Sequence, residues 1–404
     1  MSTVDVSPNV PTALVERVRT RLVASGSGAT ALDVTAALRE EGVVLGDSSL
    51  LEVVRLVRDE LVGAGALESV LRDSAVTDVL VNGPRDVWVD RGSGLEPVDV
   101  ELPDEMSIRR LAQRLAADAG RRLDDASPYV DARLRDGTRL HAVLPPISPT
   151  GTVISLRVPR RVSFDLDALV RRETVTRTGA QLLAALVASR TSFLISGGTG
   201  SGKTTILSTL LGLVDPGERV VIVEDCVELR PDHPHVVRLE TRPPNVEGVG
   251  AIELRDLVRQ SLRMRPDRLV VGEVRGAEVV DLLAALNTGH DGGAATVHAN
   301  SATDVPARLE ALALSAGLSR DALHSQLRAA LSVVVHVERD RDGRRRVLAM
   351  HVLSDADDAH LAAVPAAVFE ADGTLAKGPA WPALCGLLTS GDREGRATIP
   401  RGCA

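Results

Sequence analysis

Eight consecutive residues, 197–204, have the types and spacing needed to bind phosphate. They read Gly-Gly-Thr-Gly-Ser-Gly-Lys-Thr, which fits GxxxxGK[ST], between the apolar runs SFLIS and ILSTLLGLV. Glycines let successive backbone N–H groups turn toward phosphate oxygens, and a following helix adds its positive N-terminus. Lys203 supplies charge for the β- and γ-phosphates, and the Thr204 hydroxyl can ligate Mg²⁺. The sequence therefore predicts a P-loop whose binding residues are Gly197, Gly198, Thr199, Gly200, Ser201, Gly202, Lys203, Thr204 and Thr205.

Acidic residues close two apolar runs and have the chemistry to serve the metal and the attacking water. Glu273 ends LVVGE, and Glu224 and Asp225 follow VVIV. The carboxyl ends of parallel strands face the crevice where ligands bind. We expect Glu273 to act as general base or water-positioning residue, with indirect support of Mg²⁺ as the lesser alternative. Glu224 and Asp225, with Glu228 close by, are expected to support Mg²⁺ and its waters. A helix N-cap is the alternative for Asp225.

Two histidines are further candidates. His298 closes the apolar run AATVH, and His290 lies in the polar segment TGHDGG. At a strand end in the same sheet as Glu273, His298 is expected to sense or contact the γ-phosphate. An ordinary structural role is the alternative for both histidines.

The apolar pattern divides the chain into five parts that must position these side chains. Helical spacing such as Leu14, Val18 and Leu22 predicts a small helical bundle in residues 1–72. Short strands around turns, with one helix, predict an α+β domain in 73–165. Residues 166–178 are expected to be a linker. In 179–350, apolar strands alternate with helices, which predicts a mostly parallel sheet covered on both faces. Residues 351–404 show no motif and are expected to be a tail of unknown role.

Composition narrows the classes of function. The chain has 404 residues and a net charge of −8, with three Phe, two Trp and one Tyr. Acidic charge and few aromatic residues disfavour a direct nucleic-acid binder. The sequence has no apolar run of transmembrane length, and its start, MSTVDVSPNV, lacks the pattern of a signal peptide. Lys203 and Lys377 are the only lysines, and one stands where a planar guanidinium would not fit the phosphate cradle.

Five ordered segments resemble the motifs of one known superfamily. GGTGSGKTT, VIVEDCVEL, RLETRPPNVEG, LRMRPDRLVVGEVRG and NTGHDGGAATVHANS resemble the Walker A box, the Asp box, an Arg-rich segment, the Walker B box and the His box of the type II/type IV secretion ATPases. Within it, the chain most resembles the TadA/CpaF branch, the assembly motors of tight-adherence (Flp-type) pili. VTDVLVNGPRDVWVDRG and RLRDGTRLHAVLPP resemble that branch's N-terminal domain. The chain has three cysteines, too few for the four-cysteine zinc module usual in type II secretion ATPases, which favours the TadA/CpaF branch. Cys226 departs from that branch, which more often has a small or hydroxyl residue at this place in the Asp box.

The resemblance implies an α/β fold class: a RecA-like P-loop NTPase domain, preceded by an α+β (PAS-like) domain and the small helical bundle. It implies a homo-hexameric, Mg²⁺-dependent ATPase with ATP bound between the two domains. Implied partners are inner-membrane platform proteins of a pilus or secretion system, with no direct nucleic acid. The implied location is the cytoplasm, peripheral to the inner face of the cytoplasmic membrane. The resemblance also implies that arginines close on the γ-phosphate; the matching residues are Arg139, Arg157 and Arg263, for which surface salt bridges are the alternative.

Two other functions remain open on the sequence. A nucleic-acid-translocating ATPase of conjugative type IV secretion would share the RecA-like core, and DNA-stimulated turnover would identify it. A nucleotide-gated scaffold would bind ATP and hydrolyse little. The presence of Glu273 argues against a scaffold, because a scaffold needs no water-positioning base.

Overall fold

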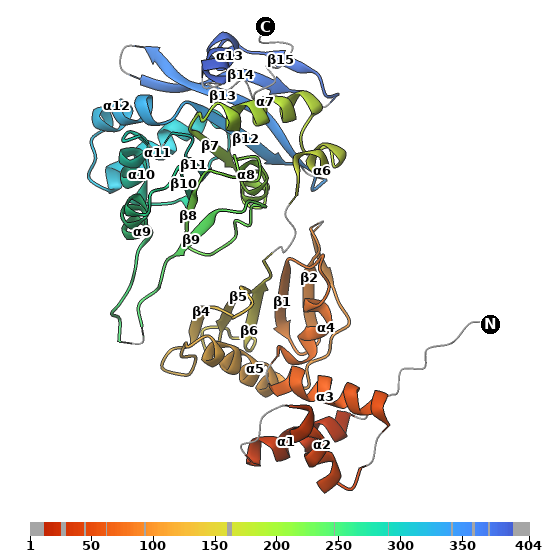
Figure 1. Cartoon of the computed structure of the whole chain (residues 1–404). Helices are drawn as coiled ribbons and strands as arrows, with labels where there is room; N and C mark the ends of the chain where they lie inside the picture. The colour runs from red at the N-terminus through yellow and green to blue at the C-terminus, as the bar shows by residue number, and fades with distance from the viewer. Residues whose placement is uncertain are drawn as a thin grey trace, which may run out of the picture. The chain divides into compact units, whose positions relative to one another are not determined.

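The computed structural model describes most of the chain, which forms two compact units. The first unit runs from Met1 to Pro159 and the second from Arg160 to Ala404 (Figure 1). Among the described residues, no helix combines the length and the apolar character needed to span a membrane. The described ranges are 12–25, 30–43, 46–61, 63–92, 94–159, 164–245, 247–289, 291–340, 342–357, 360–370 and 372–390.

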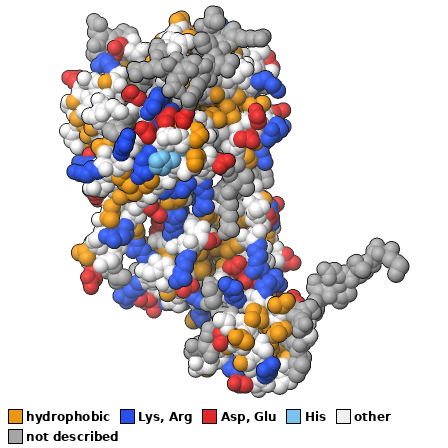
Figure 2. All heavy atoms as spheres, viewed as in Figure 1, with side chains coloured by type: hydrophobic (Ala, Val, Ile, Leu, Met, Phe, Trp, Pro, Cys, Tyr) orange, Lys and Arg blue, Asp and Glu red, His pale blue; other side chains and the backbone are white. Residues whose placement is uncertain are grey.

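Three helices open the first unit: α1 (Thr12–Ser25), α2 (Ala31–Glu40) and α3 (Asp47–Leu61). They pack around buried side chains that include Val18, Val53 and Val57, so helices form where the apolar spacing predicts them. Figure 2 shows hydrophobic side chains at the surface of this bundle, where Leu32 and Leu51 are exposed. The bundle ends with α3, since the next buried residues, Ala64 and Leu67, belong to the core of the sheet that follows.

That second core lies under an antiparallel sheet with strand order β3-β2-β1-β6-β5-β4. Buried residues alternate along the five longer strands, as Val79 and Val81 do in β1, because successive side chains point to opposite faces. One face packs against α5 (Glu105–Asp118), η1 (Gly65–Leu67) and α4 (Glu68–Leu71). The strands are β1 (Asp78–Gly83), β2 (Asp86–Asp90), β3 (Leu95–Pro97), β4 (Tyr129–Arg133), β5 (Arg139–Val143) and β6 (Val153–Arg157).

The second unit is built on a nine-stranded mixed sheet, in the order β15-β14-β13-β12-β7-β11-β10-β8-β9. The six strands from β12 to β9 are parallel, and β13, β14 and β15 extend the sheet as antiparallel strands. The strands are β7 (Phe193–Gly197), β8 (Val220–Glu224), β9 (Val236–Glu240), β10 (Arg268–Val274), β11 (Ala294–His298), β12 (Val333–Arg339), β13 (Arg345–Asp357), β14 (His360–Phe369) and β15 (Leu375–Lys377).

Helices cover both faces of this sheet, as the continuous apolar strands predict. In β7, Phe193 and Ile195 join one core and Leu194 joins the other. The first core holds residues of α6 (Leu166–Arg171), α7 (Arg177–Ala188), α8 (Lys203–Leu211) and α13 (Trp381–Ser390). The second holds residues of α9 (Leu254–Ser261), α10 (Glu278–Leu286), η3 (Ala302–Asp304), α11 (Val305–Ser315) and α12 (Arg320–Ala330), with η2 (Leu262–Met264) following α9.

Two predicted segments differ from the structure. Residues 166–178, expected as a linker, form α6 and the start of α7, and Leu169 and Val175 are buried in the first core. Within 351–404, expected as a tail, the described residues continue the sheet and add α13. Polar composition hid the helices in 166–178, where Leu169 and Val175 are the residues that reach the core. In 351–390, where buried residues such as Phe369 and Leu384 are numerous, weak periodicity hid the strands and α13.

We predict that α13 contributes substantially to the stability of the second unit. Leu384 is fully buried, so Leu384→Ala is expected to lower the free energy of unfolding by about 2–5 kcal/mol, through lost burial and the cavity left behind. Urea unfolding followed by circular dichroism measures this. The exposed Thr389 on the same helix is the control, and Thr389→Ala is expected to change the free energy by under about 0.5 kcal/mol. Equal stability of the two variants would show that α13 is dispensable.

Candidate active site

The glycine-rich segment forms a loop between the end of β7 at Gly197 and the start of α8 at Lys203. Gly202 precedes the helix with φ of 99°, a left-handed conformation that glycine adopts without steric cost. At Gly197, a Cβ would lie 2.1 Å from the carbonyl oxygen of Val337 on β12. A strand, a turn and a helix N-terminus therefore stand where the phosphate motif requires them, and a side chain at Gly197 would displace the loop.

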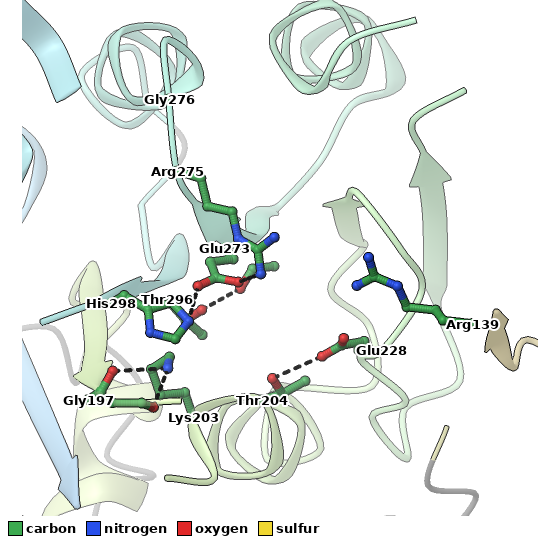
Figure 3. Close-up of polar contacts among 12 residues, drawn as sticks. Arg139, Gly197, Lys203, Thr204, Glu228, Glu273, Arg275, Gly276, Thr296 and His298 are labelled. Atoms are coloured by element: carbon green, nitrogen blue, oxygen red, sulfur yellow. Dashed lines mark hydrogen bonds and ion pairs between the residues drawn. The ribbon is translucent and has the colours of Figure 1, made fainter. Parts of the chain in front are cut away.

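Lys203 points back over this loop. Its Nζ donates to the carbonyl oxygens of Gly197, at 3.0 Å, and Gly198, at 2.8 Å (Figure 3). The side chain is buried, and burial lowers the pKa of Lys203, while Glu273 and Glu228 act in the opposite direction. No ion pair described in the structure includes Lys203. A buried ammonium bonded only to neutral oxygens favours an anion at this place, so the cradle fits a nucleotide phosphate.

Glu273, near the carboxyl end of β10, is held by two side chains. Its Oε1 lies 2.6 Å from Nε2 of His298, and its Oε2 accepts from the guanidinium of Arg275 (Figure 3). Burial and the charge of Lys203 lower the pKa of His298, against the opposing charge of Glu273. The 2.6 Å contact with His298 on one oxygen and the bond from Arg275 on the other fix the direction of the Glu273 carboxylate. Each carboxylate oxygen keeps a further lone pair for a water molecule.

Strand order brings these groups together. His298, the last residue of β11, pairs with Gly197 of β7, and β10 lies on the other side of β11. The carboxyl ends of three adjacent parallel strands therefore carry the P-loop, His298 and Glu273. Their proximity follows from the sheet, although they lie up to about 100 residues apart in the sequence.

Glu224 differs from its predicted role. It is 3% exposed, and its Oε1 accepts from the backbone N–H groups of Glu228, at 3.0 Å, and Leu229, at 2.9 Å. This geometry makes Glu224 the brace of the loop after β8 and not a group open to a metal ion. Burial raises the pKa of Glu224 to about 7, against the two backbone donors. The prediction failed because the strand-end position was read without the depth at which the side chain lies.

Glu228 takes the position that was expected for Glu224. Its Oε2 lies 3.4 Å from the Thr204 hydroxyl, and its side chain is exposed (Figure 3). A hydroxyl facing an open carboxylate beside a phosphate cradle fits Mg²⁺, which takes few protein ligands and keeps several waters. Asp225 is exposed directly after β8, and its charge raises the pKa of Arg275 together with Glu273 and Glu228, against burial. Thr204 and Glu228 are thus the residues that would hold the ion.

The predicted arginines lie in three different settings. Arg139 on β5 and Arg157 on β6 are direct cross-strand neighbours in the first unit, and Arg133 pairs with Arg139 from β4. Arg157 binds Asp78 at 2.9 Å, and Arg139 lies 3.7 Å from Asp131. Arg133, Arg139 and Arg157 therefore form a row across the adjacent strands β4, β5 and β6.

Arg263 lies in η2, ahead of the amino end of β10. It is exposed and donates to the carbonyl oxygen of Arg259 at 3.4 Å. Seven residues of β10 separate it from the site at the carboxyl end, a strand length of about 20 Å. The structure does not bring Arg263 to the P-loop of its own unit.

Sequence reasoning missed two supporting residues. Arg275 holds Glu273, and Glu278 at the start of α10 accepts from the backbone N–H groups of Arg275 and Gly276. The spacing of Arg275 from Glu273, two residues, was the available signal, since it places both on one side of the chain. Thr199 is exposed in the loop and Thr205 is half-buried in α8. His290 lies outside the described residues.

Together the mixed sheet, the P-loop and a positioned carboxylate define a RecA-like P-loop ATPase. The sequence model of the family described as "Type II/IV secretion system protein" matches residues 60–372. The chain belongs to this family and is one of its ATPases.

Comparison with individual proteins agrees. A putative conjugal transfer protein of Mycobacterium tuberculosis is 56% identical over 320 residues, which cover 78% of this chain and 91% of that protein. The conjugal transfer protein TrbB of Rhizobium radiobacter is 32% identical, over 74% of this chain and 90% of TrbB. The crystal structure of the pilus retraction motor PilT with bound ADP has a similar fold, with a TM-score of 0.51, 19% identity, and coverage of 72% of this chain and 83% of that one. None of these findings singles out the TadA/CpaF branch.

We predict a pH-dependent cost of burying Glu224. Because the folded pKa, about 7, lies above the ordinary 4.5, the unfolded chain ionises first, and stability falls as pH rises from about 4.5 to 7. Glu224→Gln keeps an oxygen acceptor and removes the ionisation. Relative to this variant, the wild type is expected to lose about 2–3 kcal/mol of unfolding free energy between pH 5 and pH 8. Urea unfolding of both proteins at the two pH values measures it, and identical pH dependence would contradict the assignment.

Proposed function

We propose that the chain is the ATPase motor of a conjugal-transfer or related type IV secretion machine. The observation that carries this proposal is the 56% identity to a putative conjugal transfer protein, which the chain matches over 91% of its length. The motor works as a homo-hexamer bound to inner-membrane platform proteins at the cytoplasmic face of the membrane. ATP hydrolysis moves the two units of each subunit relative to each other, and the ring transmits that movement to its partners.

In the proposed reaction, the P-loop N–H groups and Lys203 hold the phosphates of ATP. Glu273 accepts a hydrogen bond from the attacking water and directs its oxygen at the γ-phosphorus, while the bond to the β–γ bridging oxygen breaks. His298 and Arg275 keep the Glu273 carboxylate in place. Mg²⁺, held by Thr204 with Glu228 beside it, would neutralise charge on the β- and γ-phosphate oxygens.

The arginine row of the first unit supports a role in domain closure. Arg133, Arg139 and Arg157 occupy directly opposed positions on three adjacent strands, and like charges opposite each other destabilise a sheet. Asp78 and Asp131 offset part of this repulsion, and a phosphate anion beside the row would offset more of it. We therefore assign Arg139 and Arg157 to the γ-phosphate of a closed state, where their charge stabilises the transition state. Arg263, which is far from its own P-loop, serves the nucleotide of a neighbouring subunit.

A tight-adherence pilus assembly motor is the second candidate. The segments that resemble that branch build β1, β2 and β5 of the first unit. The net charge of −8 and the six aromatic residues also favour a protein cargo over direct contact with DNA. Both candidates share the hydrolysis site and differ in what the ring moves.

We predict that the purified wild-type protein hydrolyses ATP without DNA, and that Glu273→Gln lowers kcat by at least about 100-fold while ATP still binds. Lys203→Ala is expected to lose ATP binding, because the buried ammonium that meets the phosphates is gone. Phosphate release and the binding of a fluorescent ATP analogue measure the two steps. Glu370→Gln, which makes the same chemical change at an exposed turn, is the control and is expected to retain wild-type turnover.

Adding single- and double-stranded DNA at several salt concentrations separates the candidates. In the proposed type IV machine the motor acts through partner proteins, so turnover stays the same with DNA. Turnover that requires DNA and falls steeply with salt would make the chain itself a DNA translocase. Wild-type turnover in Glu273→Gln would remove Glu273 from its role. ATP-dependent ring formation with negligible wild-type turnover would favour a nucleotide-gated scaffold.

A further inference from the structure

The hairpin of β12 and β13 contacts the P-loop although it lies about 130 residues later in the sequence. Nε of Arg345, the first residue of β13, donates to the carbonyl oxygen of Gly200 at 2.9 Å, across 145 residues of chain. The aliphatic part of the same side chain lies beneath Gly202, where a Cβ would come within 3.1 Å of Cδ of Arg345. One arginine therefore contacts the loop at two places.

The bond to Gly200 restricts where the next backbone N–H points. In a trans peptide, the C=O and the following N–H point in opposite directions. Because Arg345 holds the Gly200 carbonyl, it also limits the directions that the N–H of Ser201 can take. That N–H points at the carbonyl oxygen of Gly198, at 3.4 Å, the oxygen that Nζ of Lys203 also contacts at 2.8 Å. Two donors, the Ser201 N–H and the Lys203 ammonium, thus meet at the Gly198 carbonyl oxygen and tie the loop together.

The loop depends on an outside contact for this orientation. Gly200 has φ of 69° and is exposed, and glycine peptides have much conformational freedom to lose. A guanidinium bound to the carbonyl restricts rotation of this peptide and polarises it, which strengthens its N–H as a donor. The same hairpin fixes the start of the loop, where His336 of β12 bonds Ser196 through Nδ1 at 2.9 Å. β12 and β13 thus support the P-loop at both ends.

We propose that Arg345 is a positioning residue for phosphate binding: it binds the Gly200 carbonyl and so holds the peptide between Gly200 and Ser201, and with it the backbone of the P-loop, in the conformation that receives the β-phosphate of the nucleotide. Arg345 acts through the backbone of the loop and not by contact with the phosphate. The inference rests on the nucleotide-binding part of the proposed function and is independent of what the motor moves.

The test uses the full-length protein with two probes, ADP and inorganic pyrophosphate. Arg345→Ala is expected to raise the dissociation constants of both by about tenfold, the loss typical of a hydrogen bond to a charged group. Pyrophosphate binds the phosphate cradle but has no adenine ring. Equal losses of affinity for the two probes therefore locate the defect in the cradle. Binding is measured by calorimetry for ADP and by competition for pyrophosphate, and thermal melting confirms that the variant is folded.

Arg344→Ala is the matched control, because it removes the same charge from the neighbouring residue. Arg344 is 64% exposed and lies 3.9 Å from Glu173, and its loss is expected to leave both constants within about twofold of wild type. Arg345→Lys keeps the charge without the directed Nε donor and is expected to bind both probes more weakly than wild type. This variant carries the test if Arg345→Ala does not fold. Wild-type affinity in either Arg345 variant, or an equal loss in Arg344→Ala, would overturn the proposal.

Discussion

The buried ammonium group of Lys203 is the constraint on which the second unit depends. It lies at the N-terminus of α8, with backbone carbonyl oxygens as its only described hydrogen-bond partners, and burial already lowers its pKa. A buried ammonium group costs free energy unless oxygens surround it. Here a rigid loop supplies backbone carbonyl oxygens, and a bound nucleotide would add phosphate oxygens. The parallel sheet, the helix N-terminus and the left-handed glycines meet this demand together, which is why the loop follows a fully buried strand.

Strand order converts one phosphate site into a hydrolysis site. β11 lies next to β7, and β10 lies next to β11, so the side chains at their carboxyl ends lie at the same edge of the sheet as the P-loop. Glu273 is useful there because His298 and Arg275 hold both of its oxygens. On the other side of β7, the β12–β13 hairpin contacts the loop from outside. The P-loop thus lies between β11 and β10, which carry His298 and Glu273, and the β12–β13 hairpin, which holds the loop in place.

Burial, and not residue type, separates the acidic residues after β8. Glu224 and Glu228 both carry carboxylates four positions apart, but the first is 3% exposed and bound to backbone N–H groups, while the second is open and near Thr204. Four residues of irregular chain turn the second side chain toward the loop and leave the first one in the core. A strand-end pattern predicts that acidic groups gather here, but it does not determine which one meets solvent.

Local chemistry let the sequence by itself determine the P-loop, the alternating strands and helices of its sheet, the α+β character of the first unit and the helices before it. The spacing of the glycines and the lysine is typical of a phosphate-binding loop, and continuous apolar runs are typical of strands buried on both faces. The sequence did not determine the roles of residues 166–178 and 351–390, the burial of Glu224, or the support from Arg275 and Arg345. Those depend on which strands become neighbours and how deep each side chain lies. Arg345 and Gly200 are 145 residues apart, and only the packing of β12 and β13 beside β7 brings them within a hydrogen bond.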